Sequence, residues 1–246
     1  MVLEEKVALV TGGAARIGRV IVRKLAAAGC DVVIHYNESA ADAAALSEEL
    51  KLLGRQAWIV GGDLSEEGEP ENVMRSAWDL AGWVDILVNN AAAYSRDPFE
   101  EAARDEYEKL WRINALAPAL LSKTFAECIA SSDILPADYT GHVINILDSK
   151  VASADLGALP YWMSKKALEA FTTGGALELA PAGITVNGIA PGPVLVPAAV
   201  SGDQAGSAPL ARRCTPNDVA DAVVYLASSD AVTGQILYID SGRHIG

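Results

Sequence analysis

The fold is constrained most by short apolar runs that alternate along the chain with longer helical segments. The first run, at residues 6–11, is continuously apolar rather than apolar at every second residue, which is typical of a strand buried on both faces of a parallel sheet. Seven runs are predicted strands, at residues 6–11, 31–35, 56–60, 85–89, 142–147, 185–189 and 235–240. Helices are predicted at residues 17–28, 39–53, 70–81, 104–130 (interrupted near Pro118), 161–180 and 217–227. This order predicts an α/β fold, a doubly wound, Rossmann-like parallel sheet of about seven strands with helices on both faces.

Length, charge and cysteine content limit the classes of function. The chain of 246 residues shows no linker or repeat, so we expect one domain spanning residues 1–246. The net charge of −13 argues against a nucleic-acid or anionic-membrane partner, because both require clustered cations. Residues 179–202 are uncharged, but their prolines and glycines break any membrane-spanning helix. The three cysteines lack metal-ligand spacing and no signal peptide is visible, so we expect a cytoplasmic protein without a metal site.

The first predicted strand leads into a glycine-rich turn and then a helix. Residues Thr11–Gly18 read TGGAARIG. A helix N-terminus in this position presents backbone N–H groups and the positive end of the helix dipole to a phosphate. The alternative is that the glycines only make a tight turn.

Three further motifs follow strands at the same predicted edge of the sheet. Gly62–Leu64 follows the third strand, where the Asp63 carboxylate could accept a hydrogen bond from an adenine amino group. Asn89–Ala91 ends the fourth strand and Pro191–Gly192 follows the sixth. Each motif alone is typical of a turn or a strand cap. Their common position at the carboxyl ends of strands indicates a dinucleotide site.

Tyr161 and Lys165 stand four residues apart on a predicted helix, so they share one face. An ammonium beside a phenol lowers the tyrosine pKa and makes Tyr161 a usable proton donor. The alternative is a packed ring with a solvated ammonium nearby. Asp148 ends an apolar run thirteen residues before Tyr161. It is a second candidate, unless it only caps backbone N–H groups at the strand end.

Taken together, these motifs resemble the short-chain dehydrogenase/reductase family over essentially the whole chain. The family's TGxxxGxG matches Thr11–Gly18 with Arg16 in place of the middle glycine, and its NNAG matches Asn89–Ala92 with alanine in place of glycine. The YxxxK motif is Tyr161 and Lys165. The mid-helix asparagine of the family matches Asn114. Most members carry a serine where this chain has Asp148, and Ser149 is one residue too late.

The departures from the family pattern resemble the pteridine reductase subgroup. Shared features are Arg16, His35-Tyr36, Asp148 and the run at residues 176–181, and Tyr94 falls where that subgroup places an aromatic ring against the pterin. Ala92 and Glu38 depart from the subgroup, which has serine and arginine at these positions. The catalytic residues implied by the resemblance are Asp148, Tyr161, Lys165 and Asn114, the last keeping a relay water in place. The substrate-binding residues implied are Arg16, Tyr94, Asp148 and Tyr161. The cofactor-binding residues implied are Gly12, Arg16, Ile17, Gly18, His35, Tyr36, Asn37, Ser39, Asp63, Leu64, Asn90, Ala91, Tyr161, Lys165, Pro191 and Gly192.

The chemistry of Asp148 gives an independent reason to expect a pterin. A ketone develops an oxyanion beside this position, which a carboxylate would repel. A pterin or dihydrofolate presents ring C=N bonds with N–H and amino donors alongside, which a carboxyl group can accept. The favoured hypothesis is hydride transfer from NADPH to such a ring. The alternatives are a carbonyl or 3-oxoacyl-thioester reductase that uses Ser149, and a catalytically silent dinucleotide-binding scaffold.

NADP is favoured over NAD because the second strand ends in Tyr36 rather than in the acid that binds a ribose 2′-hydroxyl. Arg16, Asn37 and Ser39 could meet a 2′-phosphate, whereas Glu38 would repel it. The resemblance implies a homo-oligomer, a tetramer or dimer, packed through residues 104–130 and the Tyr161 helix. The small residues Ala167, Ala170, Gly174 and Gly175 would permit close approach there. The loop from Val194 to about Arg213 is expected to cover a small-molecule substrate.

Overall fold

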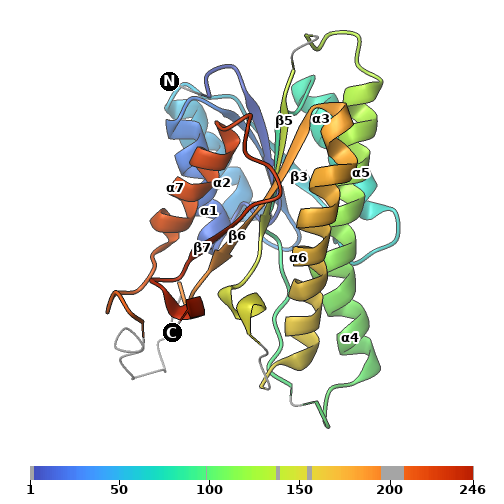
Figure 1. Ribbon diagram of the computed structural model, residues 1–246. Helices are drawn as coiled ribbons and strands as arrows, with labels where there is room; N and C mark the ends of the chain where they lie inside the picture. The colour runs from blue at the N-terminus through green and yellow to red at the C-terminus, as the bar shows by residue number, and fades with distance from the viewer. Residues whose placement is uncertain (1–2, 98, 137–138, 154–156, 195–207, 246) are drawn as a thin grey trace.

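Seven parallel strands form one sheet in the order β3-β2-β1-β4-β5-β6-β7 (Figure 1). The computed structural model describes residues 3–97, 99–136, 139–153, 157–194 and 208–245. The strands are β1 (Val7–Val10), β2 (Asp31–Tyr36), β3 (Ala57–Gly61), β4 (Ile86–Asn89), β5 (Gly141–Ile146), β6 (Ile184–Pro191) and β7 (Ile236–Ile239). The order turns back between β1 and β4, and in open α/β sheets ligands bind outside the carboxyl ends of strands at such a point. The predicted doubly wound, Rossmann-like fold is confirmed.

Helices cover both faces of the sheet (Figure 1). One face carries α1 (Arg16–Ala27), α2 (Ala40–Leu52) and α7 (Pro216–Ala227). The other carries α3 (Glu69–Ala81), α5 (Ala117–Ala130) and α6 (Leu159–Leu179), with α4 (Arg104–Trp111) leading into α5. Shorter helical turns are η1 (Arg112–Leu116), η2 (Ser149–Ala152), η3 (Ala180–Ala182) and η5 (Arg243–Ile245). No helix within the described ranges is long and apolar enough to cross a membrane.

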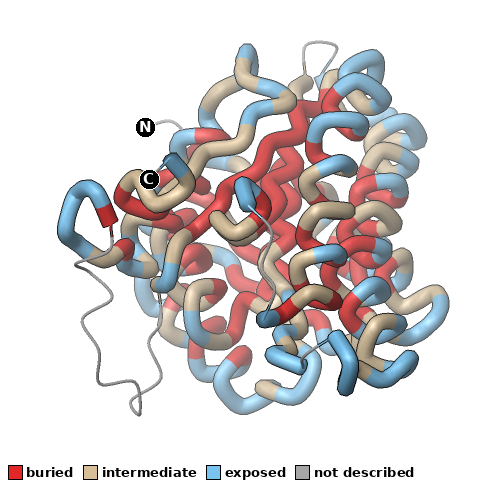
Figure 2. Tube along the Cα trace, turned by 60° about the horizontal axis from the view of Figure 1, so that its bottom comes forward, coloured by how far each residue is buried: buried red, intermediate tan, exposed pale blue. Residues whose placement is uncertain are grey.

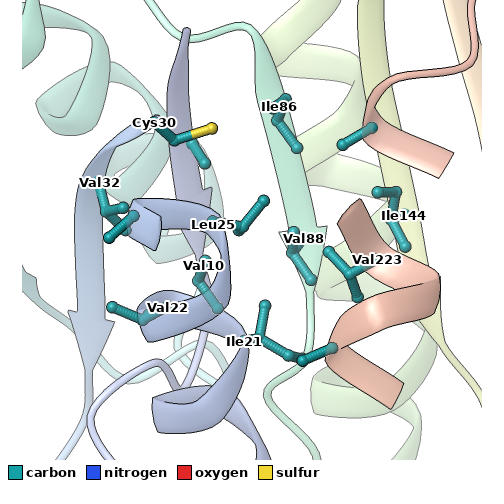
Figure 3. Packing of buried hydrophobic residues seen from close by; sticks show 14 of the residues in the cluster. Val10, Ile21, Val22, Leu25, Cys30, Val32, Ile86, Val88, Ile144 and Val223 are labelled. Carbon is teal, nitrogen blue, oxygen red and sulfur yellow. The ribbon is translucent and has the colours of Figure 1, made fainter. Parts of the chain in front are cut away.

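Each face of the sheet is closed by its own apolar core. On the α1 and α7 side, Val10 and Leu25 belong to one buried cluster with Val223 (Figure 3). On the opposite side, Leu9 belongs to a second cluster with Phe125. Adjacent residues of β1 therefore face different cores, which explains why the strand runs are apolar without alternation. Burial follows the sheet through the centre of the molecule (Figure 2).

The long helical tract is interrupted near Pro118, as the sequence predicted. The interruption is a π-helical turn, η1, in which Ala117 N donates to Arg112 O. Pro118 lies in the first turn of α5, where a missing N–H group costs little. The predicted interruption near Pro118 is therefore confirmed in place, but its cause is the π-turn, which has no simple sequence signature, because proline is tolerated at a helix start.

The loop expected to cover the substrate lies mostly outside the described residues, which resume at Ala208. Its described end is attached to the C-terminal turn, because Leu210 N donates to Ser241 O at 3.2 Å. The same turn lies against the end of β6, where a Cβ added at Gly192 would be 3.0 Å from the Asp240 Cα. The C-terminal turn therefore forms part of the frame at the carboxyl edge of the sheet.

Candidate active site

The ends of β1 and β4 are tied together at the point where the strand order turns back. The Thr11 hydroxyl accepts hydrogen bonds from Asn90 N at 2.9 Å and from Ala91 N at 3.0 Å. The Asn90 side chain donates in return to Thr11 O at 2.8 Å and Gly12 O at 3.2 Å. Two motifs that are 79 residues apart in sequence thus meet at one edge, as predicted.

The glycine-rich turn is shaped by close packing and by left-handed backbone. Gly12 has φ +60°, and a Cβ added at Gly18 would lie 2.2 Å from Gly12 O, so no other residue fits there. Arg16, the first residue of α1, has φ +52° and is exposed. This conformation costs a non-glycine residue about 1–2 kcal/mol. Ile17 follows it in the first turn of α1, at the position where the sequence predicts a phosphate site.

The end of β2 is occupied by an aromatic ring rather than by an acid. The Tyr36 hydroxyl would lie 3.0 Å from a Cβ added at Gly61, so the ring packs over that glycine in β3. Asn37 and Glu38 are exposed, and Ser39 precedes α2 without a side-chain capping hydrogen bond. His35, in contrast, is buried.

Asp63 lies in the turn after β3, next to the buried Leu64. Its Oδ1 accepts from Ser65 N at 2.9 Å and from the Ser65 hydroxyl at 2.7 Å. These hydrogen bonds, one from Asn37 and the charge of Lys109 hold the pKa of Asp63 below its ordinary value, while partial burial opposes them. The carboxylate is therefore ionised at neutral pH and can accept further donors.

The two candidates of the reaction centre, Asp148 and Tyr161, are in direct contact. The Tyr161 hydroxyl donates to Asp148 Oδ2 at 3.0 Å. The other carboxylate oxygen, Oδ1, accepts from Lys150 N at 2.9 Å and caps η2. The capping interpretation of Asp148 is therefore confirmed for Oδ1, while Oδ2 contacts the Tyr161 hydroxyl, so the catalytic role of Asp148 stays a prediction. Ser149 is half-buried in η2.

Lys165 is buried on the same helix as Tyr161, with 3% of its surface exposed. Its ammonium donates to Ile146 O at 2.8 Å, at the carboxyl end of β5. Burial lowers the pKa of Lys165 to about 8, and the negative charge of Asp148 opposes this shift. The alternative of a solvated ammonium is wrong for this lysine.

Asn114 lies inside the π-helical turn η1 and is fully buried. Its Oδ1 accepts from Ala93 N at 2.9 Å, and its Nδ2 donates to Ala93 O at 2.9 Å and to the Ser164 hydroxyl at 3.0 Å. Ser164 in turn donates to Tyr161 O at 2.7 Å. The Asn114 side chain thus joins the segment after β4 to α6. Both of its amide hydrogens are engaged, so a relay water would need other donors. The sequence did not single out Ser164, although its place between Tyr161 and Lys165 was a usable signal.

Tyr94 is 55% exposed, and its ring contacts Tyr161 edge-on with 4.8 Å between the ring centroids. The Tyr94 hydroxyl accepts from Arg96 Nε at 3.0 Å. On the far side, Pro191 is buried at the end of β6 and Gly192 follows it. The expected substrate-binding and cofactor-binding residues therefore come from the carboxyl ends of the strands, the loops that follow them, the first turn of α1 and α6. Across the described ranges, no group of three or more His, Cys, Asp or Glu side chains could hold a metal ion.

Comparison with known proteins identifies a family. A family model described as enoyl-(acyl carrier protein) reductase matches residues 12–244. The short-chain dehydrogenase/reductase eriH of Hericium erinaceus is 32% identical, over 96% of this chain and 97% of that protein. Pteridine reductase 1 of Leishmania tarentolae is 32% identical, over 96% of this chain and 95% of that protein.

A solved structure agrees over the full length. FolM alternative dihydrofolate reductase 1 from Brucella canis, complexed with NADP, superimposes with a TM-score of 0.91 at 31% identity. The match covers 100% of this chain and 97% of that chain. By its fold, its strand-end motifs and these matches, the chain belongs to the short-chain dehydrogenase/reductase family of oxidoreductases.

Proposed function

We propose that this oxidoreductase transfers hydride from NADPH to a C=N bond of a pterin or dihydrofolate-like ring. The observation that carries the proposal is the Asp148 carboxylate, 3.0 Å from the Tyr161 hydroxyl, at a position where most members of the family have serine. Two similar proteins are named pteridine reductase 1 and FolM alternative dihydrofolate reductase 1. Both names favour a pterin-like substrate over a simple ketone.

The carboxyl edge of the sheet fits a dinucleotide. The first turn of α1 presents N–H groups to a pyrophosphate, and Asp63 can accept from an adenine amino group. The Lys165 ammonium can donate hydrogen bonds to the ribose hydroxyls of the cofactor. When bound, the nicotinamide supplies the hydride, and the protein orients it.

NADPH is favoured over NADH by the end of β2. Tyr36 fills the place of a ribose-binding acid, and its ring is held against Gly61. The exposed Arg16 and Asn37 can turn to a 2′-phosphate, with Ser39 close in sequence. Glu38 is exposed as well and can direct its charge to solvent. The complex of the Brucella protein with NADP agrees with this choice.

The side chains then divide the proton chemistry between them. Tyr161 donates a proton to the ring nitrogen, and the buried ammonium of Lys165 stabilises the phenolate that remains. Asp148 accepts from the N–H and amino donors of the ring, and through its contact with Tyr161 it can pass a proton taken up from solvent to the phenolate. Tyr94 stands at the edge of Tyr161, where its ring can pack on a flat substrate. Asn114 holds the segment after β4 against α6.

A second candidate function is reduction of a carbonyl group, as in a 3-oxoacyl thioester, and a thioester-linked substrate is favoured by the matching family model, described as enoyl-(acyl carrier protein) reductase. In that case Ser149, one residue after Asp148, would be the neutral donor to an oxyanion. A silent scaffold is less consistent with the site, because a scaffold has no need of a buried lysine beside the reaction centre.

Two substitutions separate the pterin and acyl alternatives. Asp148→Ser removes the carboxylate but keeps a residue that caps a helix well, so η2 should persist. A charge-assisted hydrogen bond to the pterin contributes about 1.5–3 kcal/mol, so dihydropterin turnover should fall by roughly ten- to a hundredfold. Turnover of a simple ketone should stay level or rise. Asp148→Asn is the matched control: it keeps the size and shape of the side chain and removes only its negative charge.

The opposite result would support the acyl alternative. If Ser149→Ala abolishes ketone or 3-oxoacyl reduction while Asp148→Ser leaves every activity unchanged, the proposed function is wrong. Both variants should be assayed with NADPH on one dihydropterin and one 3-oxoacyl substrate, at equal cofactor saturation.

We also propose that one domain spans residues 1–246, that the protein is cytoplasmic and that it assembles as a homo-oligomer, a tetramer or dimer. α6 exposes Ala170, Gly174 and Leu177, the last with 82% of its surface exposed. A Cβ added at Gly174 would meet nothing within 4 Å, so another helix could approach there. Gly175 does not belong to this face, because it is buried against the Phe171 ring.

A further inference from the structure

His35 is a buried histidine whose two ring nitrogens each meet the backbone of a different loop. It is the last residue but one of β2 and is 2% exposed. Gly12 N lies 3.1 Å from Nδ1, and Gly62 O lies 3.1 Å from Nε2. Gly12 belongs to the turn after β1 and Gly62 to the turn after β3, the two strands that flank β2. The side chain therefore spans the two loops on either side of its own strand.

The two partners determine the protonation state of the ring. A backbone N–H can only donate, so Nδ1 must be without hydrogen, and a carbonyl can only accept, so Nε2 must carry one. The imidazole is therefore neutral and in its Nε2–H tautomer, as inferred from the partners. Burial lowers the pKa of His35 to about 4, against smaller opposing effects of the Gly62 carbonyl and the Asp63 charge. The ring thus remains an acceptor for Gly12 at neutral pH.

The backbone of His35 engages the same glycine-rich turn. Gly13 N donates to His35 O at 2.9 Å, so the N–H groups of Gly12 and Gly13 are both directed to this residue. A phosphate must then be met by the N–H groups of the first turn of α1. Because Gly12 O lies against the Cα of Gly18, a shift of Gly12 would move the start of α1.

The other end of the bridge leads to the expected adenine site. Gly62 N donates to Tyr36 O at 3.0 Å, and the next residue is Asp63. Backbone hydrogen bonds attach each turn to β2, and the His35 ring adds the side-chain link between Gly12 N and Gly62 O. Neither turn is a regular element, so each needs such a constraint to be ordered before a ligand arrives.

We propose that His35 is a positioning residue for the dinucleotide: it holds the glycine-rich turn and the Gly62–Asp63 turn at a fixed separation without touching the cofactor. This differs from the direct cofactor contact expected from the sequence. It rests on the proposed function only in requiring that the edge of the sheet binds NADPH. A positioning residue of this kind affects binding of the cofactor more than the chemical step.

The test is a fluorescence titration of NADPH with His35→Phe, which keeps a ring of similar size and removes both nitrogens. The dissociation constant should rise by about tenfold or more, since two hydrogen bonds that order the site are lost. The KM for NADPH should rise in parallel, while kcat at saturating NADPH should change little. His35→Asn keeps an acceptor near the Nδ1 position and should recover most of the affinity.

His142 provides a matched control at the opposite end of the sheet. It is also 2% exposed, lies at the start of β5, and its Nδ1 contacts the Thr185 hydroxyl at 2.9 Å. His142→Phe should lower the melting temperature and leave NADPH binding unchanged. Should His35→Phe fail to fold, His35→Gln serves in its place with His142→Gln as its control. The glutamine removes the acceptor for Gly12 but keeps a polar side chain in the interior.

Each outcome has one meaning. Weaker NADPH binding by His35→Phe or His35→Gln, with unchanged binding by the matching His142 variant, supports the positioning role. Unchanged binding by His35→Phe or His35→Gln, or an equal loss in the His35 variant and its His142 control, overturns it and leaves the proposed reductase intact. Failure of the unmodified protein to bind NADPH would overturn the proposed function and this inference together.

Discussion

Replacing Lys165 with methionine should change how the stability of the protein depends on pH. The Lys165 ammonium is buried, and its pKa falls from 10.5 to about 8 in the folded chain. Below pH 8 the lysine is protonated in both the folded and the unfolded state, so the penalty for burying its charge is constant. Between pH 8 and 10.5 only the unfolded chain keeps this proton, so rising pH favours the folded wild type.

The magnitude follows from the same shift. Each pKa unit corresponds to 1.36 kcal/mol, so the free energy of unfolding of wild type should gain about 3 kcal/mol over Lys165→Met across this window. Loss of the hydrogen bond to Ile146 O shifts the difference by a constant and does not alter its slope. Titrating groups that do not interact with Lys165 behave alike in both proteins and cancel.

The measurement is urea unfolding of the cofactor-free protein, followed by tryptophan fluorescence at several pH values from 7 to 10.5. Lys123→Met is the control, because that side chain is 70% exposed on α5 and should show no such slope. If the difference in the free energy of unfolding between wild type and Lys165→Met stays constant over this pH range, burial does not lower the pKa of Lys165 as claimed.

Three further predictions concern the site and the assembly. Tyr161→Phe should lower turnover by about 10²–10⁴-fold with NADPH binding retained, and a variant that keeps most of its rate would exclude Tyr161 as the proton donor. Arg16→Gly relieves a residue at φ +52°, so calorimetry should show unchanged or higher stability, by up to about 1 kcal/mol, while NADPH binds more weakly; a clear loss of stability would contradict the strain. Gly174→Arg should reduce the oligomer to smaller species in light scattering, and a wild type that is already monomeric at micromolar concentration would rule out the assembly.

The sheet was predictable because its residues obey one simple constraint. Each of the central strands must bury side chains on both faces, so runs such as residues 7–10 and 86–89 contain little that is polar. The approximate start of α7 was also readable, and its Thr215 and Asp218 form a capping box there. In these places local sequence and tertiary structure require the same residues.

The sequence predicted which residues form the candidate site but not which contacts they make with one another. The motifs placed Asp148 and Tyr161 together, yet only the structure divides the two oxygens of Asp148 between Tyr161 and Lys150 N. The hydrogen bond from Asn114 Nδ2 to the Ser164 hydroxyl depends on the π-turn, which brings the Asn114 amide to α6. The double role of His35 depends on strands that are adjacent in the sheet but not in the sequence. Pairings between loops of different strands are set by packing, and a single sequence does not encode them as a pattern.

The most direct measurement is the consumption of NADPH by the purified protein with a panel of dihydropterin, dihydrofolate, quinone, 3-oxoacyl and enoyl-thioester substrates. We expect the highest kcat/KM with the dihydropterin or dihydrofolate. This value should be higher with NADPH than with NADH, and it should fall by roughly ten- to a hundredfold in Asp148→Ser. A higher kcat/KM with a 3-oxoacyl or enoyl thioester, retained in Asp148→Ser, would contradict the assignment of Asp148 to a pterin-like ring.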